Sequence, residues 1–283
     1  MAREGRRIKT VDPINYIIPF IMPTRSGASN FFEATLDITE AEKFLREKRM
    51  AGQSNLSIMH VIMAAYVRVV SQYPGINRFI RGQRIYARNG ISISLTIKKK
   101  LTLDAQETVV QLIADPRDTI DDIYNKLNTL VEENKEEGDT NGMDALIRLV
   151  CKIPRIFLKS FVGSLKVLDY FGCMPRIITK LSPFHGSMFL TNVGSLGIDA
   201  IYHHLYDFGN CPVFIAMGKR KNILELTDED EVIKKKAITI TVVTDERICD
   251  GHYYAEAFKK IKRYIENPSL LETPPETVVE DIK

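Results

Sequence analysis

Apolar and polar residues follow two different periods in the first quarter of the chain. Residues 30–38 alternate between the two kinds, as the side chains of a half-buried strand do. Asp37-Ile38-Thr39-Glu40 then supplies polar residues suited to a helix start, and we expect a helix over residues 41–48. From residue 54 to residue 73 apolar residues recur at helical spacing, up to Pro74-Gly75. The pattern predicts a β–α unit followed by a core helix.

The same periods predict further elements along the chain. Two short apolar runs, residues 79–80 and 85–86, flank Arg81-Gly82-Gln83-Arg84 as hairpin strands flank their turn. A charged helix is expected from Asp118 to about residue 137. The remaining strands are expected over residues 91–97, 109–113, 187–192, 213–217 and 237–244, and a last helix over residues 253–265.

A segment of different character interrupts this series. Residues 136–142 have the composition of a loop, and residues 143–180 are both apolar and basic, with seven Lys or Arg against two Asp. We expect two or three amphipathic helices there. After Ser269 the sequence predicts a loosely ordered tail.

Composition narrows the class of protein. Of the 283 residues, 45% are hydrophobic and 27% charged, which is typical of a soluble globular protein. The formal charge of +3 does not indicate a nucleic-acid partner. The four cysteines lack the CxxC spacing of a zinc site, so we expect no metal and reduced thiols. We find neither a signal peptide nor a membrane span, and expect a cytoplasmic protein.

Two segments near the C-terminus carry a family resemblance. Residues 186–197, Gly-Ser-Met-Phe-Leu-Thr-Asn-Val-Gly-Ser-Leu-Gly, resemble the glycine-led strand and Ser-Asn-x-Gly turn of dihydrolipoamide acyltransferase catalytic domains. Residues 244–251, Thr-Asp-Glu-Arg-Ile-Cys-Asp-Gly, resemble that family's Asp-His-Arg-x-x-Asp-Gly segment. Residues 30–77 are also similar to the family, so the resemblance extends over most of the chain.

The resemblance to these 2-oxo acid dehydrogenase acyltransferases, which are relatives of chloramphenicol acetyltransferase, implies an architecture. It implies an α/β two-layer fold with a mixed sheet, formed by residues 1–283 as one catalytic domain. Residues 138–183 would be an insert and residues 269–283 a tail. It further implies a homotrimer with active sites at subunit interfaces and coenzyme A or acyl-coenzyme A as a substrate. Because we identify no lipoyl or subunit-binding domain, we expect a stand-alone relative.

The main departure from the family is Glu246, which occupies the place of the catalytic histidine. Acyl transfer needs a base to take a proton from the attacking group. A free glutamate, with a pKa of about 4.3, is a weak base unless burial raises that value. Two interpretations remain open, in which Glu246 is either a substituted base or a structural or ligand-binding carboxylate.

Four other residues are candidates for the site. Thr191 matches the family's serine, which donates to the tetrahedral intermediate, and a threonine hydroxyl keeps that donor. Asp250 matches an aspartate that orients the family's site through an arginine ion pair, and we expect a structural role. His203 and His204 lie between the two motifs, and either could supply the missing base, because imidazole titrates near neutrality.

Two functions follow from these residues. The first is an acyl-coenzyme A-dependent acyltransferase with a substituted base, acting on a hydroxyl, thiol or amine acceptor. The alternative is a catalytically inactive relative that serves as a scaffold or regulatory binding protein. The basic segment at 143–180 would act as a lid, as a membrane-surface helix pair or in packing at the trimer edge.

Overall fold

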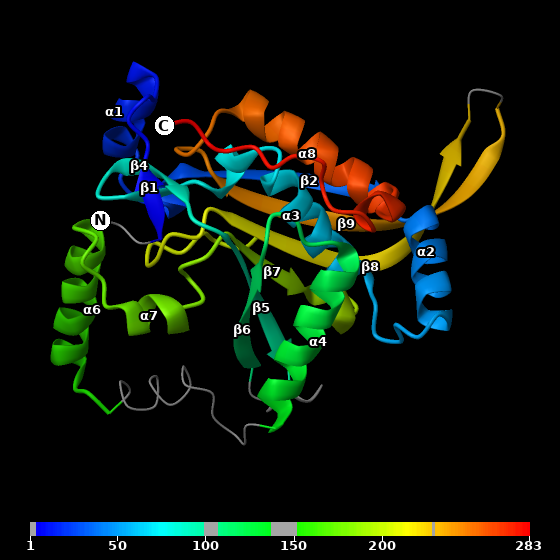
Figure 1. Cartoon of the computed structure of the whole chain (residues 1–283), viewed down its shortest axis with the longest axis horizontal. Helices are drawn as coiled ribbons and strands as arrows, with labels where there is room; N and C mark the ends of the chain where they lie inside the picture. Colours follow the sequence, from blue (N-terminus) through cyan, green and yellow to red (C-terminus); the bar gives the residue numbers. More distant parts are fainter. Residues whose placement is uncertain (1–3, 99–106, 137–151, 228–229) are drawn as a thin grey trace.

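A mixed six-stranded sheet crosses the molecule, and a three-stranded sheet lies at one end of it (Figure 1). The computed structural model describes residues 4–98, 107–136, 152–227 and 230–283. Strand order is β2-β9-β8-β7-β5-β6 in the large sheet and β1-β4-β3 in the small one. The strands are β1 (Gly5–Arg7), β2 (Ser29–Asp37), β3 (Phe79–Arg81), β4 (Arg84–Arg88), β5 (Ile91–Lys98), β6 (Glu107–Ala114), β7 (Met188–Asn192), β8 (Val213–Leu226) and β9 (Val232–Asp245).

Helices cover one face of the large sheet. The main hydrophobic core lies between that face and helices α3, α4 and α8, which contact one another around α3. The helices are α1 (Pro13–Ile21), α2 (Thr39–Met50), α3 (Ile58–Val70), α4 (Ile120–Glu136), α6 (Arg155–Tyr170), α7 (Arg176–Leu181) and α8 (Gly251–Glu266). Short 3-10 turns are η1 (Ser26–Ala28), η2 (Pro74–Asn77), η3 (Val193–Leu196) and η4 (Pro268–Leu271).

The opposite face of the sheet, which we call the second face, has a smaller apolar cluster. Residues 197–211 cross it, anchored where the hydroxyl of Thr241 donates to the carbonyl of Ile201 at 2.6 Å. This connection contributes Leu205 to the cluster. The cluster contains Phe189, Leu205, Cys211, Phe214 and Val243.

The predicted fold class is confirmed, because the chain forms an α/β structure with a mixed sheet. Strand β7 runs parallel to both β5 and β8, whereas β9 is antiparallel to β8 and β2. Helix α3 begins at Ile58 and not near residue 54, because the Ser57 and His60 side chains form a capping box at that point.

The largest difference from prediction is the length of β8 and β9. Both strands continue beyond the core as a hairpin arm that projects from the body (Figure 1). The sequence pattern ends at residues 217 and 237 because the side chains of the arm, from Lys219 to Lys236, are mostly exposed. Backbone hydrogen bonds extend the ladder there, with a cross-strand ion pair of 2.6 Å between Lys235 and Glu225, and a hydropathy pattern detects neither.

The ends of the chain also differ from expectation. Helix α1 was not predicted and exposes most of its apolar side chains. The tail, expected to be loosely ordered, packs against the body, with Leu271 buried and Val279 donating its backbone N–H to the Ser71 carbonyl at 2.8 Å. An ion pair of 2.5 Å between Arg78 and Asp281 holds its last residues.

The basic segment forms helices, as expected. Helices α6 and α7 account for two of the two or three predicted amphipathic helices. Residues 137–151, including the loop predicted at the boundary, lie outside the described residues.

Candidate active site

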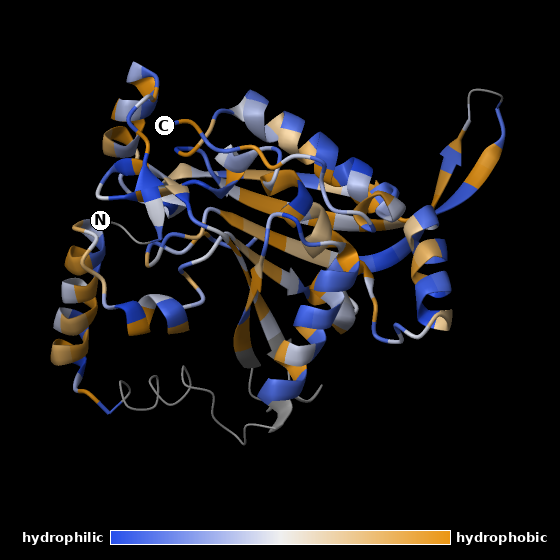
Figure 2. Ribbon diagram, in the orientation of Figure 1, coloured by the Kyte–Doolittle hydropathy of each residue, from blue (hydrophilic) through white to orange (hydrophobic). Residues whose placement is uncertain are grey.

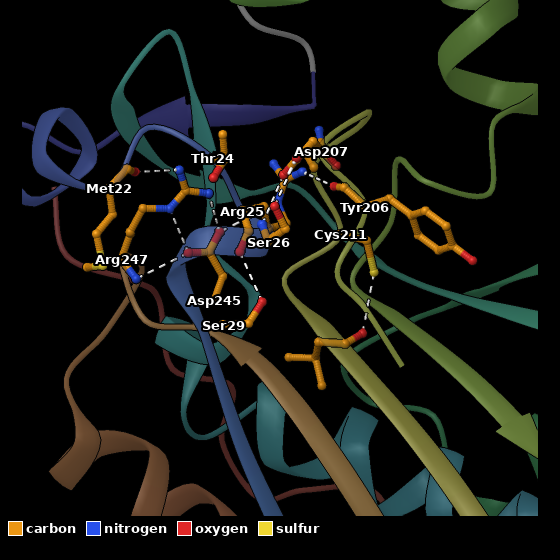
Figure 3. Close-up of polar contacts among 12 residues, drawn as sticks. Met22, Thr24, Arg25, Ser26, Ser29, Tyr206, Asp207, Cys211, Asp245 and Arg247 are labelled. Carbon is orange, nitrogen blue, oxygen red and sulfur yellow. Dashed lines mark hydrogen bonds and ion pairs between the residues drawn. The ribbon is translucent and has the colours of Figure 1, made fainter. Parts of the chain in front are cut away.

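A buried ion pair shapes the loop that follows β9. Asp245 is fully buried and accepts two hydrogen bonds from the Arg247 guanidinium, from Nε at 2.8 Å and from Nη2 at 2.7 Å. Arg247 also donates to the Met22 carbonyl at 3.1 Å (Figure 3). A buried charge needs both a counter-ion and hydrogen bonds, and this bidentate pair supplies both.

A second arginine connects this loop to the segment before β2. The Arg25 Nε lies 3.5 Å from Asp245 Oδ2, and Arg25 Nη1 donates to the Tyr206 carbonyl at 2.6 Å. Burial lowers the pKa of Arg25, and the charge of Asp245 opposes that shift. Next to it, Asp207 accepts hydrogen bonds from both the backbone N–H and the hydroxyl of Ser26, each at 2.9 Å (Figure 3). The chain before β2, the crossing connection and the loop after β9 thus form one rigid unit.

Glu246 lies in the middle of this rigid loop but takes no part in its ion pairs. Its backbone N–H donates to the Ala28 carbonyl at 2.9 Å, and its neighbours Asp245 and Arg247 are buried. The Glu246 side chain is exposed and forms no hydrogen bond or ion pair with any described residue. The loop therefore holds the backbone of this carboxylate in place and leaves the carboxylate itself available.

Asp250 caps the helix that follows. Its Oδ1 accepts the backbone N–H of Tyr253 at 2.8 Å at the start of α8. A cap of this kind contributes about 1 kcal/mol to stability. The arginine pair that the resemblance implies for Asp250 is formed in this structure by Asp245.

Thr191 lies on the second face, close to the end of β7. Side chains alternate between the faces of a strand, so Thr191 shares a face with Phe189, a member of the small cluster. Its half-buried hydroxyl makes no hydrogen bond with the described residues. The following turn lies close to β8, because a Cβ placed on Gly194 would come within 2.2 Å of the Gly218 carbonyl oxygen. Glycine at position 194 therefore allows the turn to approach.

Strand register shows that Thr191 and Glu246 of one chain lie far apart. Thr191 is opposite Ala216, and Ala216 is opposite Thr241. Glu246 lies five residues beyond Thr241, which corresponds to about 17 Å along the strand direction. One chain therefore does not bring these two side chains together.

His203 lies closer to Thr191. Its ring stacks on Phe214 with 4.4 Å between centroids, and Phe214 is opposite Phe189, two residues before Thr191. His203 Nε2 is buried and has no hydrogen-bond partner among the described residues. Burial lowers the pKa of His203, so the imidazole is neutral and able to accept a proton at pH 7. His204 is exposed.

Two further histidines have structural positions. The Nδ1 of His60 is 2.9 Å from the Ser57 hydroxyl in the α3 cap, and that of His185 is 2.8 Å from the Ser182 hydroxyl. Burial lowers the pKa of each to about 4.

A polar cavity of about 300 Å³ opens beside the turn that follows Thr191. Its donors come from the start of α3 and from the bulge of β8, where Lys219 and Arg220 are half-exposed. Ser57, Met59, Asn192, Ser195, Lys219 and Arg220 are among its lining residues. Within the described ranges, no group of three or more His, Cys, Asp or Glu is placed to hold a metal ion.

Solved structures with a similar fold indicate the class of protein. The fold is similar to a probable dihydrolipoamide acetyltransferase from Listeria monocytogenes, with a TM-score of 0.56, 13% identity, and coverage of 93% of this chain and 95% of that one. It is similarly close to the dihydrolipoamide acetyltransferase of Azotobacter vinelandii, with a TM-score of 0.56, 11% identity and coverage of 91% and 88%. A chloramphenicol acetyltransferase aligns with a TM-score of 0.53, 11% identity and coverage of 91% and 99%. The chain therefore has the fold of chloramphenicol acetyltransferase-like acyltransferases.

Part of the sequence also matches a known protein family. Residues 179–273, which contain both motifs, match the family described as 2-oxoacid dehydrogenases acyltransferase (catalytic domain). A search of curated proteins found no matching relative. The resemblance inferred from residues 186–197 and 244–251 is thus confirmed, because residues 179–273 match this family and the fold is similar to dihydrolipoamide acetyltransferases.

The sequence reasoning missed the ion pairs that build the site. Arg25 lies 220 residues before Asp245, so no local pattern connects them. The Asp-x-Arg spacing of Asp245 and Arg247 was visible but was used only as a family motif. Their charges indicate in retrospect a local bidentate pair.

Proposed function

We propose that this protein transfers an acyl group from a coenzyme A thioester to a hydroxyl, thiol or amine acceptor, at sites shared between the subunits of a homotrimer. The observation that carries the proposal is the placement of Thr191 and Glu246. Each has a polar group that no described residue pairs, and each lies within residues 179–273, which match the acyltransferase family.

The sharing between subunits follows from the separation of these residues. Thr191 and Glu246 of one chain lie about 17 Å apart along the strand direction, so they can act together only if they come from different subunits. One of the similar structures is the cubic core of the pyruvate dehydrogenase multienzyme complex, which is an assembly.

The proposed reaction needs a base, an oxyanion donor and a leaving group. The base takes the proton of the acceptor, whose oxygen, sulfur or nitrogen attacks the thioester carbonyl carbon. The Thr191 hydroxyl donates a hydrogen bond to the oxyanion of the tetrahedral intermediate. The intermediate collapses by breaking its bond to the coenzyme A sulfur, and the protonated base returns a proton to the thiolate.

Two side chains compete for the role of base. Glu246 lies in the segment that resembles the family's Asp-His-Arg motif, and a neighbouring subunit would complete its surroundings. His203 lies on the same face as Thr191, has an unpaired Nε2 and is neutral at pH 7. We assign the role first to Glu246 on its position, with His203 as the alternative within one chain.

The polar cavity beside the 193–196 turn is the proposed position of the coenzyme A phosphates. Lys219 and Arg220 provide positive charge there, and the N-terminus of α3 offers backbone N–H groups. Arg220 pairs with Glu42 at 3.0 Å and Lys219 lies 3.6 Å from Asp199, so phosphate binding would rearrange both pairs.

A second candidate function is a catalytically inactive binding protein of the same fold. This inactive alternative is favoured by the glutamate at position 246, where the family has a histidine. The Glu246 side chain is exposed and forms no hydrogen bond or ion pair with the described residues. Such a protein would bind coenzyme A or an acyl thioester without turning it over.

A thiol-release assay tests the proposal. Purified protein is mixed with a panel of acyl-coenzyme A donors and hydroxyl, amine and dithiol acceptors, and free coenzyme A is measured alongside direct binding of coenzyme A. Turnover that depends on Thr191 would support the acyltransferase. Binding without turnover across the panel would support the inactive alternative, and the absence of both would overturn the two proposals.

A further inference from the structure

The insert contributes two helices that the proposed chemistry does not use. Helix α6 lies at the edge of the molecule and α7 leads from it back toward the central sheet (Figure 1). Hydrophobic and hydrophilic residues are interspersed along α6 on its visible side (Figure 2). The question is what the exposed apolar residues of this helix contact.

Helix α6 is attached to the body along a narrow line. Asp169 pairs with Arg81 at 3.3 Å, and the Tyr170 hydroxyl donates to Gln83 at 3.0 Å. The β3–β4 turn approaches α6 closely at Gly82, which has a φ of +54°. A Cβ at this position would lie 2.5 Å from the Tyr170 carbonyl oxygen, so the approach requires glycine. Leu165 is the one buried residue of α6. The rest of the helix surface faces away from this line.

Two stripes run along α6 on either side of the attachment line. At about 100° per residue, Phe157, Phe161 and Leu168 fall within about 40° of one another on the helix surface. The stripe of Arg155, Lys159 and Lys166 is equally narrow, and its centre lies about 160° from the apolar one, with Leu165 midway between them on the body side. The helix is therefore amphipathic in a way that its own body contacts do not require.

Helices α6 and α7 expose large apolar side chains that no other described residue covers. Ile156, Phe157 and Phe171 are 75%, 65% and 72% exposed. Val167 and, on α7, Ile177 are also exposed, at 56% and 68%. Large exposed apolar side chains gathered on neighbouring helices are typical of interaction sites.

The charge of this region points to the chemistry of the partner. Residues 152–180 contain six cations and one carboxylate, and that carboxylate, Asp169, is already paired with Arg81. None of the six forms an ion pair with a carboxylate in the described part of the chain. The six are Lys152, Arg155, Lys159, Lys166, Arg176 and Lys180.

We propose that α6 and α7 form a docking surface for an anionic phospholipid bilayer. The apolar side chains enter the boundary between headgroups and acyl chains, and the lysines and arginines contact lipid phosphates, as in interfacial amphipathic helices. Contact with a second copy of the same surface would bring twelve cations together without counter-ions, which disfavours that occupant. The contact is peripheral, since none of the described helices has the length and apolar character needed to span a bilayer.

Vesicle co-sedimentation tests this docking surface. The full chain is mixed with vesicles of phosphatidylcholine alone or of phosphatidylcholine with phosphatidylserine, at low and at high salt. We expect binding to the anionic vesicles only, and its loss at high salt, because exposed charge interactions are screened. No binding to anionic vesicles, or equal binding to both kinds, would overturn the proposal.

Matched charge variants locate the surface. The double variant Lys159→Glu/Lys166→Glu should weaken anionic-vesicle binding by at least about tenfold. Lys259→Glu/Lys262→Glu makes the same change in net charge on the exposed side of α8 and should bind as the parent does. Lys159→Arg/Lys166→Arg keeps the charge and should also bind, which controls for misfolding of the reversed variant. Equal loss in the α6 and α8 reversals would mean that net charge alone is sensed, and would contradict a local surface.

A fourth double variant distinguishes a lipid surface from a protein as the binding partner. Phe157→Ser/Phe171→Ser removes apolar side chains without changing charge, and should weaken vesicle binding by at least about tenfold. The molecular mass of this variant, measured by light scattering, should equal that of the parent. A change in molecular mass with unchanged vesicle binding would show that this surface joins copies of the chain, and the lipid proposal would be wrong.

Discussion

The loop after β9 and the second face of the sheet are built in opposite ways. In the loop, Asp245, Arg247 and Arg25 are buried, and their charges are matched by ion pairs and backbone carbonyls. On the second face, Thr191 and His203 keep polar atoms for which the described residues offer no hydrogen-bond partner. The ion pairs of the first region hold the backbone of the loop in place, whereas the second region leaves polar side-chain atoms available to bind a ligand.

This difference separates the backbone of the loop from the side chain at position 246. The ion pairs hold the residues on either side of Glu246, so a change of side chain at that position alters an exposed group and none of the buried partners. The geometry of the loop therefore does not depend on the side chain that position 246 carries.

The largest effect is expected from breaking the loop itself. Arg247→Ala leaves Asp245 buried with only the more distant Arg25, and loss of one partner of a buried pair costs about 3–5 kcal/mol. Urea unfolding would measure it. Glu246→Gln, on the same loop but exposed, should change the free energy of unfolding by less than about 0.5 kcal/mol. Similar losses in both variants would contradict the division of roles within the loop.

The second face is tested by removing the free hydroxyl. Thr191→Val keeps the shape of the side chain and removes the donor, and should lower kcat by about 10²–10³-fold if the hydroxyl holds the oxyanion. Thr191→Ser keeps the donor and should retain most of the turnover. Thiol release with a productive donor is the measurement. Full activity in the valine variant would exclude Thr191 as the oxyanion donor.

Mixing variants tests whether the two regions meet across subunits. Glu246→Gln and Thr191→Val chains, each inactive alone, should recover activity when unfolded and refolded together, because about one quarter of randomly assembled interfaces contain both intact groups. If His203 is the base, His203→Asn loses turnover and Glu246→Gln does not. Recovery on mixing the Glu246 and Thr191 variants would argue against a site within one chain.

A smaller effect distinguishes the buried histidines His60 and His185 from the exposed His204. His60 and His185 have folded pKa values of about 4, below the ordinary value, so the unfolded chain binds protons first as the pH falls. Their contribution to stability is complete above pH 6.5 and is lost between pH 6.5 and 4, by up to about 1.4 kcal/mol per pH unit for each histidine. Urea unfolding at pH 7 and pH 5 would show it. His60→Gln should flatten the dependence and His204→Gln, at an exposed position, should not.

The sequence predicts the inner parts of the fold well and its outer parts poorly. Strands β5, β7 and β9 were predicted correctly where their side chains enter the core, because burial requires apolar residues at regular positions along a strand. Helix α1 was missed because its apolar residues face outward, where no periodicity is imposed by a core. The tail was misjudged because a few specific contacts, such as the Arg78–Asp281 ion pair, order it.

The candidate site shows the same division. Thr191, Glu246 and Asp250 were found by motif, and the structure places all three at element ends. The stacking of His203 on Phe214 depends on the path of residues 197–211 across the sheet, and no local pattern contains that path. Long-range contacts of this kind require the three-dimensional fold.

The inner and outer parts of the hairpin formed by β8 and β9 should differ in local stability. From Val213 to Met217 its strands lie in the core, whereas from Asn222 outward the paired backbone is bounded mainly by exposed side chains. Amide hydrogen exchange should therefore be slow at the inner rungs, where it requires global unfolding, and fast at the outer rungs, where local opening suffices. A slowing of the outer amides at higher protein concentration would report directly on what the arm contacts in solution.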